Sequence, residues 1–315
     1  MANDHYVPQF YLRNFEIPTR HRWIFEYRHQ QQPQARAIRS VASIENYYTI
    51  NTALNDAERN QIDQVFQQLE TGASRIIAHF LTSSNAWLGP DDKEVMSMFV
   101  SFLAFRTPRA RAQVMRMDAG LRIQILRILA SHPDFIRQEA ERIGIDPNEA
   151  EAARRAVLEN SDDFYIEYGN GADDFFLGTA LEIADRVTPL LLGKQWNLLE
   201  SDNGSFITSD HPVILVRPEY CPEFIPIGFD QARVIFPLSP RRCLLLSNEF
   251  VPKRYRRKYL LDRLLHPLRT FGPERRRITN INEAEVSAIN RLVILQAHES
   301  VFSHQFAAEI EAAVG

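Results

Sequence analysis

The sequence predicts an α+β fold, with a mixed or antiparallel sheet built from N- and C-terminal strands and a large helical middle segment. Three observations support this class. Residues 1–54 are rich in β-forming side chains, residues 55–191 repeat apolar side chains at helical spacing, and short strand-like runs return over residues 195–250. Further helices are expected within residues 255–314.

The junctions between these parts carry no stretch rich in glycine and serine. We therefore expect residues 1–315 to form a single α+β domain. The alternative is a separate helical domain over about residues 55–191.

A β-hairpin is expected near the N-terminus. Residues 23–27 are rich in β-formers, residues 28–34 are polar and include Pro33, and residues 35–39 alternate apolar and polar side chains. Residues 46–50 predict another short strand.

The middle of the chain shows the spacing of amphipathic helices. Apolar side chains recur at steps of three and four over residues 62–80, 95–102, 114–128 and 176–190. Pro108 should end or kink the second of these helices. Asp146 and Pro147 read as the N-cap and first position of a further helix.

Short apolar runs separated by turn residues follow the helices, and they favour an antiparallel meander. The expected strands span residues 195–199, 205–208, 213–216, 232–236 and 242–247. We expect closing helices over about residues 255–265 and from Asn282, whose spacing to Glu285 matches a capping box.

Composition indicates a soluble cytoplasmic protein. Hydrophobic residues make up 45% of the chain and charged residues 24%, which is ordinary for a globular protein. The net charge of -4 predicts no global attraction to nucleic acid or an anionic membrane. Cys221 and Cys243 are too few for a disulfide framework, so we expect two unpaired thiols.

The segment from His5 to Phe15 is the most distinctive of the chain, because it sets an imidazole, an amide and a proline among aromatic residues. Together with Glu70, Arg106 and the segments 208–213 and 236–240, it resembles the mostly bacterial family called domain of unknown function 4238. These marks are spread over most of the chain, so the resemblance implies a full-length member. It implies no particular activity.

His5 and Gln9 would share one face of an extended segment, because side chains alternate along a strand. That arrangement would point both at whatever the segment crosses. The functional interpretation is that His5 is a general base or metal ligand with an amide beside it. The alternative is a structural histidine that hydrogen-bonds a neighbouring element.

Arg106 should point inward, because it extends the apolar row of the second helix by one step. A buried guanidinium needs carboxylate partners, and we expect these to be Glu70 and Asp210. One interpretation is a structural ion pair that holds the helices to the sheet. The other is an anion clamp, since arginine binds phosphate or carboxylate with two parallel hydrogen bonds.

Asp210 and His211 lie between two predicted strands, where loops often carry catalytic groups. The structural alternative for Asp210 is a turn made rigid by Pro212. His211 would then face solvent.

A hydrolytic site could combine these side chains, with His5, Glu70 and Asp210 as catalytic groups and Gln9 and Arg106 as substrate-binding groups. His5, Glu70 and Asp210 could also hold a divalent metal such as Mg²⁺, Mn²⁺ or Zn²⁺. The sequence contains no phosphate-binding loop, no zinc-protease motif and no serine-hydrolase motif.

The one strong run of positive charge lies at residues 253–258, and arginines up to Arg277 extend it. Its expected role is a phosphate-backbone contact surface that includes Arg254, Arg256 and Arg257. The alternative is a solvated helix face that balances the acidic region at residues 139–163.

These residues predict a hydrolase-like enzyme that acts on a phosphate-containing substrate, with nucleic acid as one candidate and nuclease activity as the corresponding reaction. The first alternative is a non-catalytic binding protein whose conspicuous polar residues are structural. The second is an interaction protein whose basic C-terminal segment docks on an acidic partner. An open cleft at the converging residues would favour an enzyme, and a closed core would favour a structural role.

Overall fold

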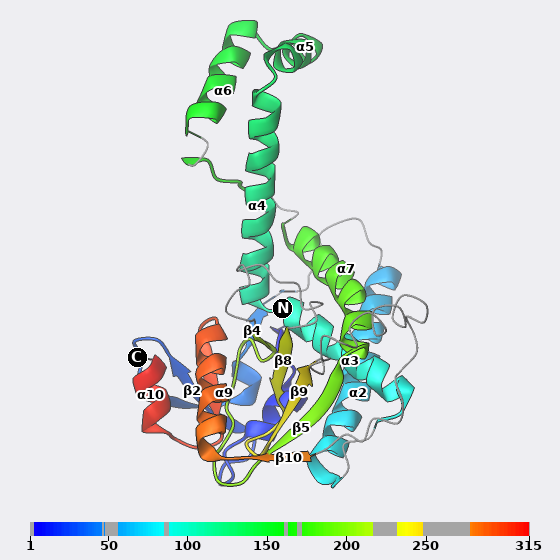
Figure 1. Cartoon of the computed structure of the whole chain (residues 1–315), viewed down its shortest axis with the longest axis vertical. Coiled ribbons are helices and arrows are strands. Elements are labelled where there is room, and N and C mark those ends of the chain that lie inside the picture. Colours follow the sequence, from blue (N-terminus) through cyan, green and yellow to red (C-terminus); the bar gives the residue numbers. More distant parts are fainter. Residues whose placement is uncertain are drawn as a thin grey trace, which may run out of the picture.

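A computed structural model gives the fold of the chain (Figure 1). It describes residues 3–45, 47, 56–84, 88–160, 163–168, 172–216, 232–247 and 278–314, with the backbone alone at 3, 56–63 and 172–174. The described residues form a body of sheets and helices, from which one long helix rises with two shorter helices at its far end. We call the helices within residues 108–160 the arm.

The strands form two larger sheets and a two-stranded one. Antiparallel pairing joins β1 (Asn3–His5) to β4 (Ser43–Glu45). The four-stranded sheet has the order β3-β2-β11-β6, and the five-stranded sheet has the order β10-β5-β9-β8-β7. The expected α+β class with a helical middle is therefore confirmed, but the strands belong to several sheets and not to one.

The four-stranded sheet joins the two ends of the chain, as the sequence predicts. The expected hairpin is present as β2 (Trp23–Arg28) and β3 (Gln34–Ala37), which pair antiparallel. Next to β2 lies β11 (Ser300–Ser303), an unpredicted strand in a region expected to be helical. Its other neighbour is β6 (Thr208–Ser209).

The five-stranded sheet contains the predicted meander only in part. Antiparallel pairing links β7 (Ile214–Val216), β8 (Arg233–Pro237) and β9 (Arg242–Ser247) in sequence order. The other neighbour of β9 is β5 (Gln195–Ser201), and β10 (Ile278–Ile281) runs parallel to β5 at the edge. The segment at 205–208 leaves the meander, because β6 pairs with β11 in the other sheet.

Three long helices pack on the body. They are α2 (Asp56–Thr82), α3 (Pro90–Phe105) and α7 (Ala172–Leu192), and each contains one of the predicted apolar rows. The structure places α3 against both α2 and α7. Gly72 of α2 is required at this crossing, because an added Cβ would lie 2.8 Å from the Val95 side chain.

The arm consists of α4 (Pro108–Ala130), α5 (Pro133–Ile143) and α6 (Pro147–Asn160). Asp146 accepts a hydrogen bond from the Asn148 amide at 2.7 Å, as expected for the residue that caps α6. The sequence analysis missed α5. Its signals are Pro133 at the first position and Gly144 just after the end, with a left-handed φ of 76°.

The remaining elements are short, except for one C-terminal helix. The predicted capping box is confirmed, since Asn282 and Glu285 exchange side-chain to backbone bonds at the start of α9 (Glu283–Gln296). The expected strand at residues 46–50 and helix at 255–265 lie outside the described residues, apart from Tyr47. The short elements are α1 (Gln9–Leu12), η1 (Arg13–Phe15), η2 (Ile38–Ser40) and α10 (Ala308–Val314).

The core consists of two hydrophobic clusters. The larger one joins the N-terminal aromatic residues to α2, α3, α7 and one part of the five-stranded sheet, and the smaller one lies under α9 and α10. Cys243 is buried and makes no disulfide with another described residue. In the part of the chain that the structure describes, every helix is too short or too polar to cross a membrane.

Candidate functional site

Arg106 ends α3 and points into the body, as its place on the apolar row predicts. The residue is 2% exposed. Its Nη1 donates to Glu70 Oε1 at 3.0 Å, which confirms the expected ion pair, and its Nε donates to the Tyr6 carbonyl at 2.9 Å. Its guanidinium carbon lies 5.0 Å from the centre of the Phe102 ring. Arg106 therefore ties α3 to α2 and to the N-terminal segment.

One nitrogen of the Arg106 guanidinium makes no hydrogen bond with a described residue. Arg106 Nη2 is buried and has no hydrogen-bond partner among the described residues. The Glu70 side chain is 34% exposed, so the ion pair reaches solvent on the carboxylate side.

Aromatic side chains hold the N-terminal segment in place. The Tyr11 hydroxyl donates to the Pro237 carbonyl at 2.7 Å and shares a 2.7 Å hydrogen bond with the Thr208 hydroxyl. The Tyr11 ring stacks on Phe236, with the ring centres 5.0 Å apart. Tyr6 bonds through its amide to the Ala42 carbonyl at 3.1 Å. The segment from β1 to α1 is thus fixed across the body.

His5 and Gln9 do not share a strand face, which corrects the sequence prediction. The strand β1 ends at His5, and α1 begins at Gln9 directly after the extended N-cap residue Pro8. The alternation of side chains therefore stops between the two residues. Both are partly buried. His5 lies one residue from the carbonyl that binds Arg106.

Asp210 has a structural set of partners. Its Oδ1 accepts from the His298 amide at 2.8 Å, and its Oδ2 accepts from the amides of Glu299 and Ser300 at 2.7 and 3.0 Å. The Asp210 amide donates to the Ser300 carbonyl at 3.0 Å. Asp210 therefore fixes the turn between α9 and β11. The expectation that Asp210 pairs with Arg106 is corrected, because backbone amides fill both of its oxygens.

Burial sets the protonation of this carboxyl and of its neighbours. Burial raises the pKa of Asp210 above its ordinary value, and the three backbone donors pull the pKa back down. Burial also raises the pKa of the Tyr6 phenol, and the nearby carboxyl groups of Asp210 and Glu299 add to that rise. The Tyr6 side chain thus lies near Asp210, while its carbonyl binds Arg106.

His211 faces the interior, contrary to the expectation that it faces solvent. Its Nδ1 shares a 2.6 Å hydrogen bond with the Thr107 hydroxyl, which also accepts from the Ala110 amide at the start of α4. Burial lowers the pKa of His211 to about 3, and positive charge from Arg109 and His298 contributes. His211 is therefore neutral at physiological pH.

These contacts define one group of residues, which we call the polar cluster: Tyr6, Glu70, Arg106, Thr107, Asp210 and His211. The contacts join segments that lie far apart in the sequence. The cluster is closed except at Glu70, whose side chain is 34% exposed, since Arg106, Thr107, Asp210 and His211 are all buried. Sequence reasoning missed Tyr6 and Thr107. Thr107 was detectable as a cap before Pro108 at the first helical position.

Arg109 is a further contact that the sequence did not reveal. Its Nη1 donates to the carbonyls of Ala297 and Leu295 at 2.9 and 3.3 Å. A cation at the C-terminus of a helix is favourable, because it satisfies carbonyls that have no partner inside the helix. Arg109 thereby joins the base of the arm to the end of α9.

The arrangement offers no metal site within the described part of the chain. No group of three or more His, Cys, Asp or Glu side chains there is placed to hold a metal ion. The proposed ligands His5, Glu70 and Asp210 all belong to that part. The basic residues Arg254, Arg256 and Arg257 lie outside the described residues.

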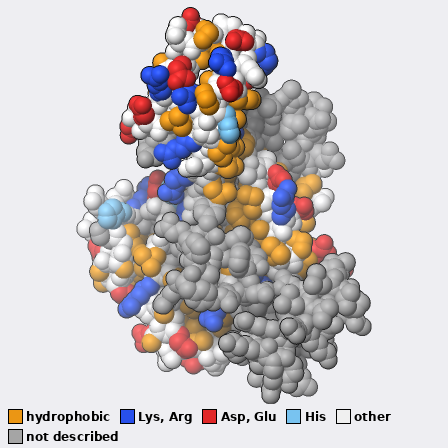
Figure 2. Space-filling model, turned by 45° about the horizontal axis from the view of Figure 1, so that its top comes forward, with side chains coloured by type: hydrophobic (Ala, Val, Ile, Leu, Met, Phe, Trp, Pro, Cys, Tyr) orange, Lys and Arg blue, Asp and Glu red, His pale blue; other side chains and the backbone are white. Residues whose placement is uncertain are grey.

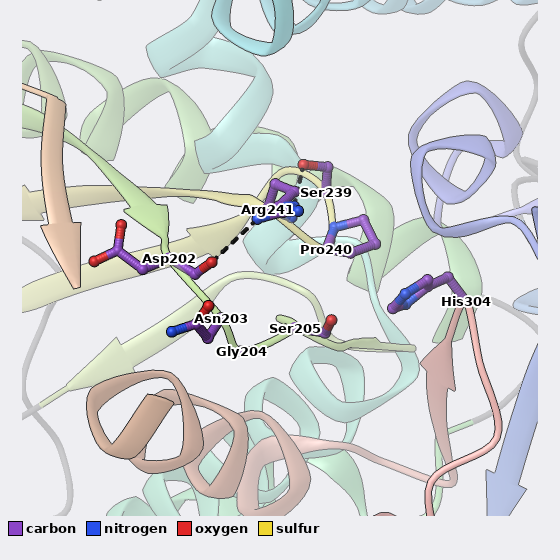
Figure 3. A pocket seen from close by; sticks show the side chains of 8 residues that line it. All are labelled: Asp202, Asn203, Gly204, Ser205, Ser239, Pro240, Arg241 and His304. Carbon is purple, nitrogen blue, oxygen red and sulfur yellow. Dashed lines mark hydrogen bonds between the residues drawn. The ribbon is translucent and has the colours of Figure 1, made fainter. Parts of the chain in front are cut away.

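A polar hollow of about 510 Å³ lies on the surface of the body (Figure 3). Its lining comes from the turn after β5, the turn between β8 and β9, and His304 after β11. Arg241 reaches across it to the carbonyls of Ser201 and Asp202 at 3.4 and 3.3 Å. The cavity walls include no residue of the polar cluster.

A family model for proteins of unknown function, DUF4238, matches residues 3–306, which is nearly the whole chain. The chain belongs to the DUF4238 family. The matched range includes the N-terminal segment, the arm and the polar cluster of this DUF4238 protein. No curated protein and no solved structure matches this DUF4238 chain.

Proposed function

We propose that this DUF4238 protein is a non-catalytic interaction protein whose polar cluster is structural. The observation that carries the proposal is the closure of the cluster around Asp210. Both carboxylate oxygens bind backbone amides of one turn, and the residue has no exposed surface. A catalytic carboxylate needs an approach for substrate and a free oxygen, and Asp210 has neither among its described contacts.

The surface best suited to a partner is the arm. The arm projects away from the body (Figure 1), and its helices expose large apolar side chains to solvent. Figure 2 shows hydrophobic side chains along the arm, interspersed with charged ones. A large contiguous apolar patch on the surface of a folded protein is typical of an interaction site. The exposed residues include Met117, Leu121, Ile125, Ile128, Phe135 and Ile143.

A survey of turnover tests this proposal. The purified chain would be assayed against phosphate monoesters, phosphate diesters, DNA and RNA, with and without Mg²⁺, Mn²⁺ or Zn²⁺. We expect no turnover at the polar cluster. Any turnover that is detected should therefore persist in His5→Ala and Glu70→Gln variants that keep the melting temperature of the wild type. Turnover that either substitution abolishes in a folded protein would overturn a non-catalytic function.

A hydrolase acting on a phosphate-containing substrate is the second candidate, and one observation favours it. Arg106 Nη2 is buried and has no hydrogen-bond partner among the described residues, and the neighbouring Glu70 side chain is 34% exposed. An oxyanion could bind to this nitrogen. In that reaction His5 would be the base, Glu70 and Asp210 the carboxylates, and Gln9 a substrate contact. A divalent metal would have to bind through the partly exposed groups.

Inorganic phosphate is the direct probe for this candidate. Calorimetric titration should show binding to the wild type that Arg106→Lys weakens, because lysine cannot present two parallel donors. Nucleic acid as substrate adds a separate requirement. Replacing Arg254, Arg256 and Arg257 with Gln should then weaken binding of labelled DNA or RNA and flatten its salt dependence. Absence of both effects would remove this candidate.

A further inference from the structure

The helix α4 carries an exposed apolar row on the side that faces away from α6. Val114, which is only 9% exposed, begins the row at the body, and Met117, Leu121, Ile125 and Ile128 continue it into solvent. These four are 48%, 61%, 46% and 61% exposed. The steps of three, four, four and three residues keep all five side chains on one side of the helix. Ala130 lies on the opposite side of the helix from Leu121 and is buried, and its carbonyl accepts a hydrogen bond from Arg154 of α6.

We propose that a second copy of this chain covers the row, with the two α4 helices packed antiparallel around a two-fold axis beside Leu121. The inference rests on the proposed function, because it names the partner of the interaction surface. It is carried by the symmetry of the row, by the charges beside it and by the charge difference between the two ends of the arm.

The row is symmetric about Leu121. Met117 and Ile125 lie four residues to either side, and Val114 and Ile128 lie seven residues to either side. In an antiparallel pair centred on Leu121, Leu121 meets its own copy. Met117 then lies level with Ile125 of the second copy. Ile128 lies level with the end of the exposed row at Val114, which is 9% exposed and offers little contact surface. A symmetric dimer requires a surface that is complementary to itself in this way.

The side chains that flank the row fit the same arrangement. On one flank Asp118 and Arg122 form an ion pair, in which the Asp118 side chain is 19% exposed and also accepts from the Tyr168 hydroxyl at 2.7 Å, while Arg122 is 53% exposed. On the other flank lie the uncharged Gln113 and Gln124. A two-fold axis perpendicular to both helices brings equal flanks together. Asp118 then lies within about one helical turn of Arg122 from the second copy. The charged flank therefore brings opposite charges together as well as like charges.

Charge also differs between the base and the tip of the arm. The helix α4 contains five arginines and one aspartate, whereas α5 and α6 together contain six carboxylates and four arginines. In an antiparallel pair, the acidic tip of one arm (α5 and α6) lies beside the positively charged start of α4 in the other arm. A parallel pair would instead align the two basic helices along about 35 Å. The charges therefore favour the antiparallel dimer.

Sedimentation of the full chain over a wide concentration range tests the proposal. The wild type should shift from monomer to dimer as its concentration rises. Leu121→Glu should raise the dimer dissociation constant by at least about 100-fold, because two leucines leave the interface and two carboxylates meet at the axis. The matched control is Leu295→Glu, which alters a leucine on α9 that is 73% exposed, against 61% for Leu121, and should leave the dimer unchanged.

Single cysteines test the direction of packing. Under mild oxidation Leu121→Cys should cross-link to itself, because the axis brings its two copies within disulfide reach. Ile128→Cys should not, since its two copies lie about 21 Å apart along an antiparallel pair. The unaltered chain gives the background from Cys221 and Cys243. Self-linking of Ile128→Cys would indicate a parallel pair and overturn the proposal.

Two further results would also overturn it. One is a wild type that stays monomeric at every concentration, and the other is a dimer that Leu121→Glu does not weaken. Neither result bears on the non-catalytic function, which the turnover survey decides separately. Conversely, turnover at the polar cluster would overturn the non-catalytic function, whereas the sedimentation test of the dimer would be unaffected.

Discussion

The polar cluster and the arm differ in which side chains they bury. In the cluster, charged and polar groups lie inside the body, and backbone amides and carbonyls satisfy most of them. On α4, leucine, isoleucine and methionine lie in solvent. Removing one partner of a buried charge strongly destabilises a fold, whereas exposed apolar surface contributes little to the stability of the monomer. The cluster is therefore expected to control stability, and the arm is expected to control association.

The largest expected effect comes from Asp210. Replacing it with Ala leaves three backbone amides of the turn before β11 without their acceptor, and a buried unsatisfied group costs about 1–3 kcal/mol. We expect Asp210→Ala to lower the free energy of unfolding by at least about 3 kcal/mol in urea titrations. The exposed Asp202 provides the control, since Asp202→Ala should change it by less than about 0.5 kcal/mol. Equal effects of the two substitutions would show that the turn tolerates the loss.

Arg106→Ala should have a somewhat smaller effect, about 3 kcal/mol, because it removes two hydrogen bonds and leaves Glu70 unpaired. The partial exposure of Glu70 limits the loss, since water can hydrate the freed carboxylate. Thermal melts at neutral pH measure it. The control is Arg75→Ala, which breaks the exposed ion pair with Asp92 and should cost less than about 1 kcal/mol. An unchanged midpoint for Arg106→Ala would contradict the structural role of the cluster.

Acidic pH should destabilise the protein through His211. The folded state holds this imidazole neutral down to about pH 3, while the unfolded chain binds a proton below its ordinary pKa of about 6.5. Its contribution is therefore complete above that pH and falls by about 1.4 kcal/mol per pH unit below it, or about 2 kcal/mol at pH 5.

His211→Asn isolates this contribution from that of other groups. Asparagine can keep the hydrogen bond to Thr107 but cannot take up a proton in this range. Urea titrations between pH 7 and pH 4 give the dependence of the unfolding free energy on pH. Its slope should correspond to about one proton fewer in the variant than in the wild type. Identical slopes would mean that His211 is protonated within the folded protein.

The smallest expected effect belongs to the arm. Leu121→Ala should change the unfolding free energy of the monomer by less than about 0.5 kcal/mol, because the side chain is largely in solvent. Leu103 of α3 is the matched control, since it is fully buried and Leu103→Ala should cost about 2–5 kcal/mol. Dilute samples are required, so that association does not add to stability. A large effect at Leu121 would show that α4 packs against the body and would remove the comparison.

Local patterns in the sequence determined most of the elements. The helical spacing in α2, α3, α4 and α7, the caps at Asp146 and Asn282, and the alternation in the β2–β3 hairpin depend only on neighbouring residues. The inward direction of Arg106 followed for the same reason, because a helix fixes which residues share a face. The partner Glu70 could also be named, because it lies at the edge of another apolar row.

Tertiary structure alone decided the partners of Asp210 and the exposure of α4. The amides that bind Asp210 lie at residues 298–300, and nothing local in either segment predicts that meeting. The row from Val114 to Ile128 has the same spacing as a core-facing helix, yet it leaves the body after its first residue. Spacing tells which side chains share a face, whereas the path of the whole chain determines whether that face meets protein or water.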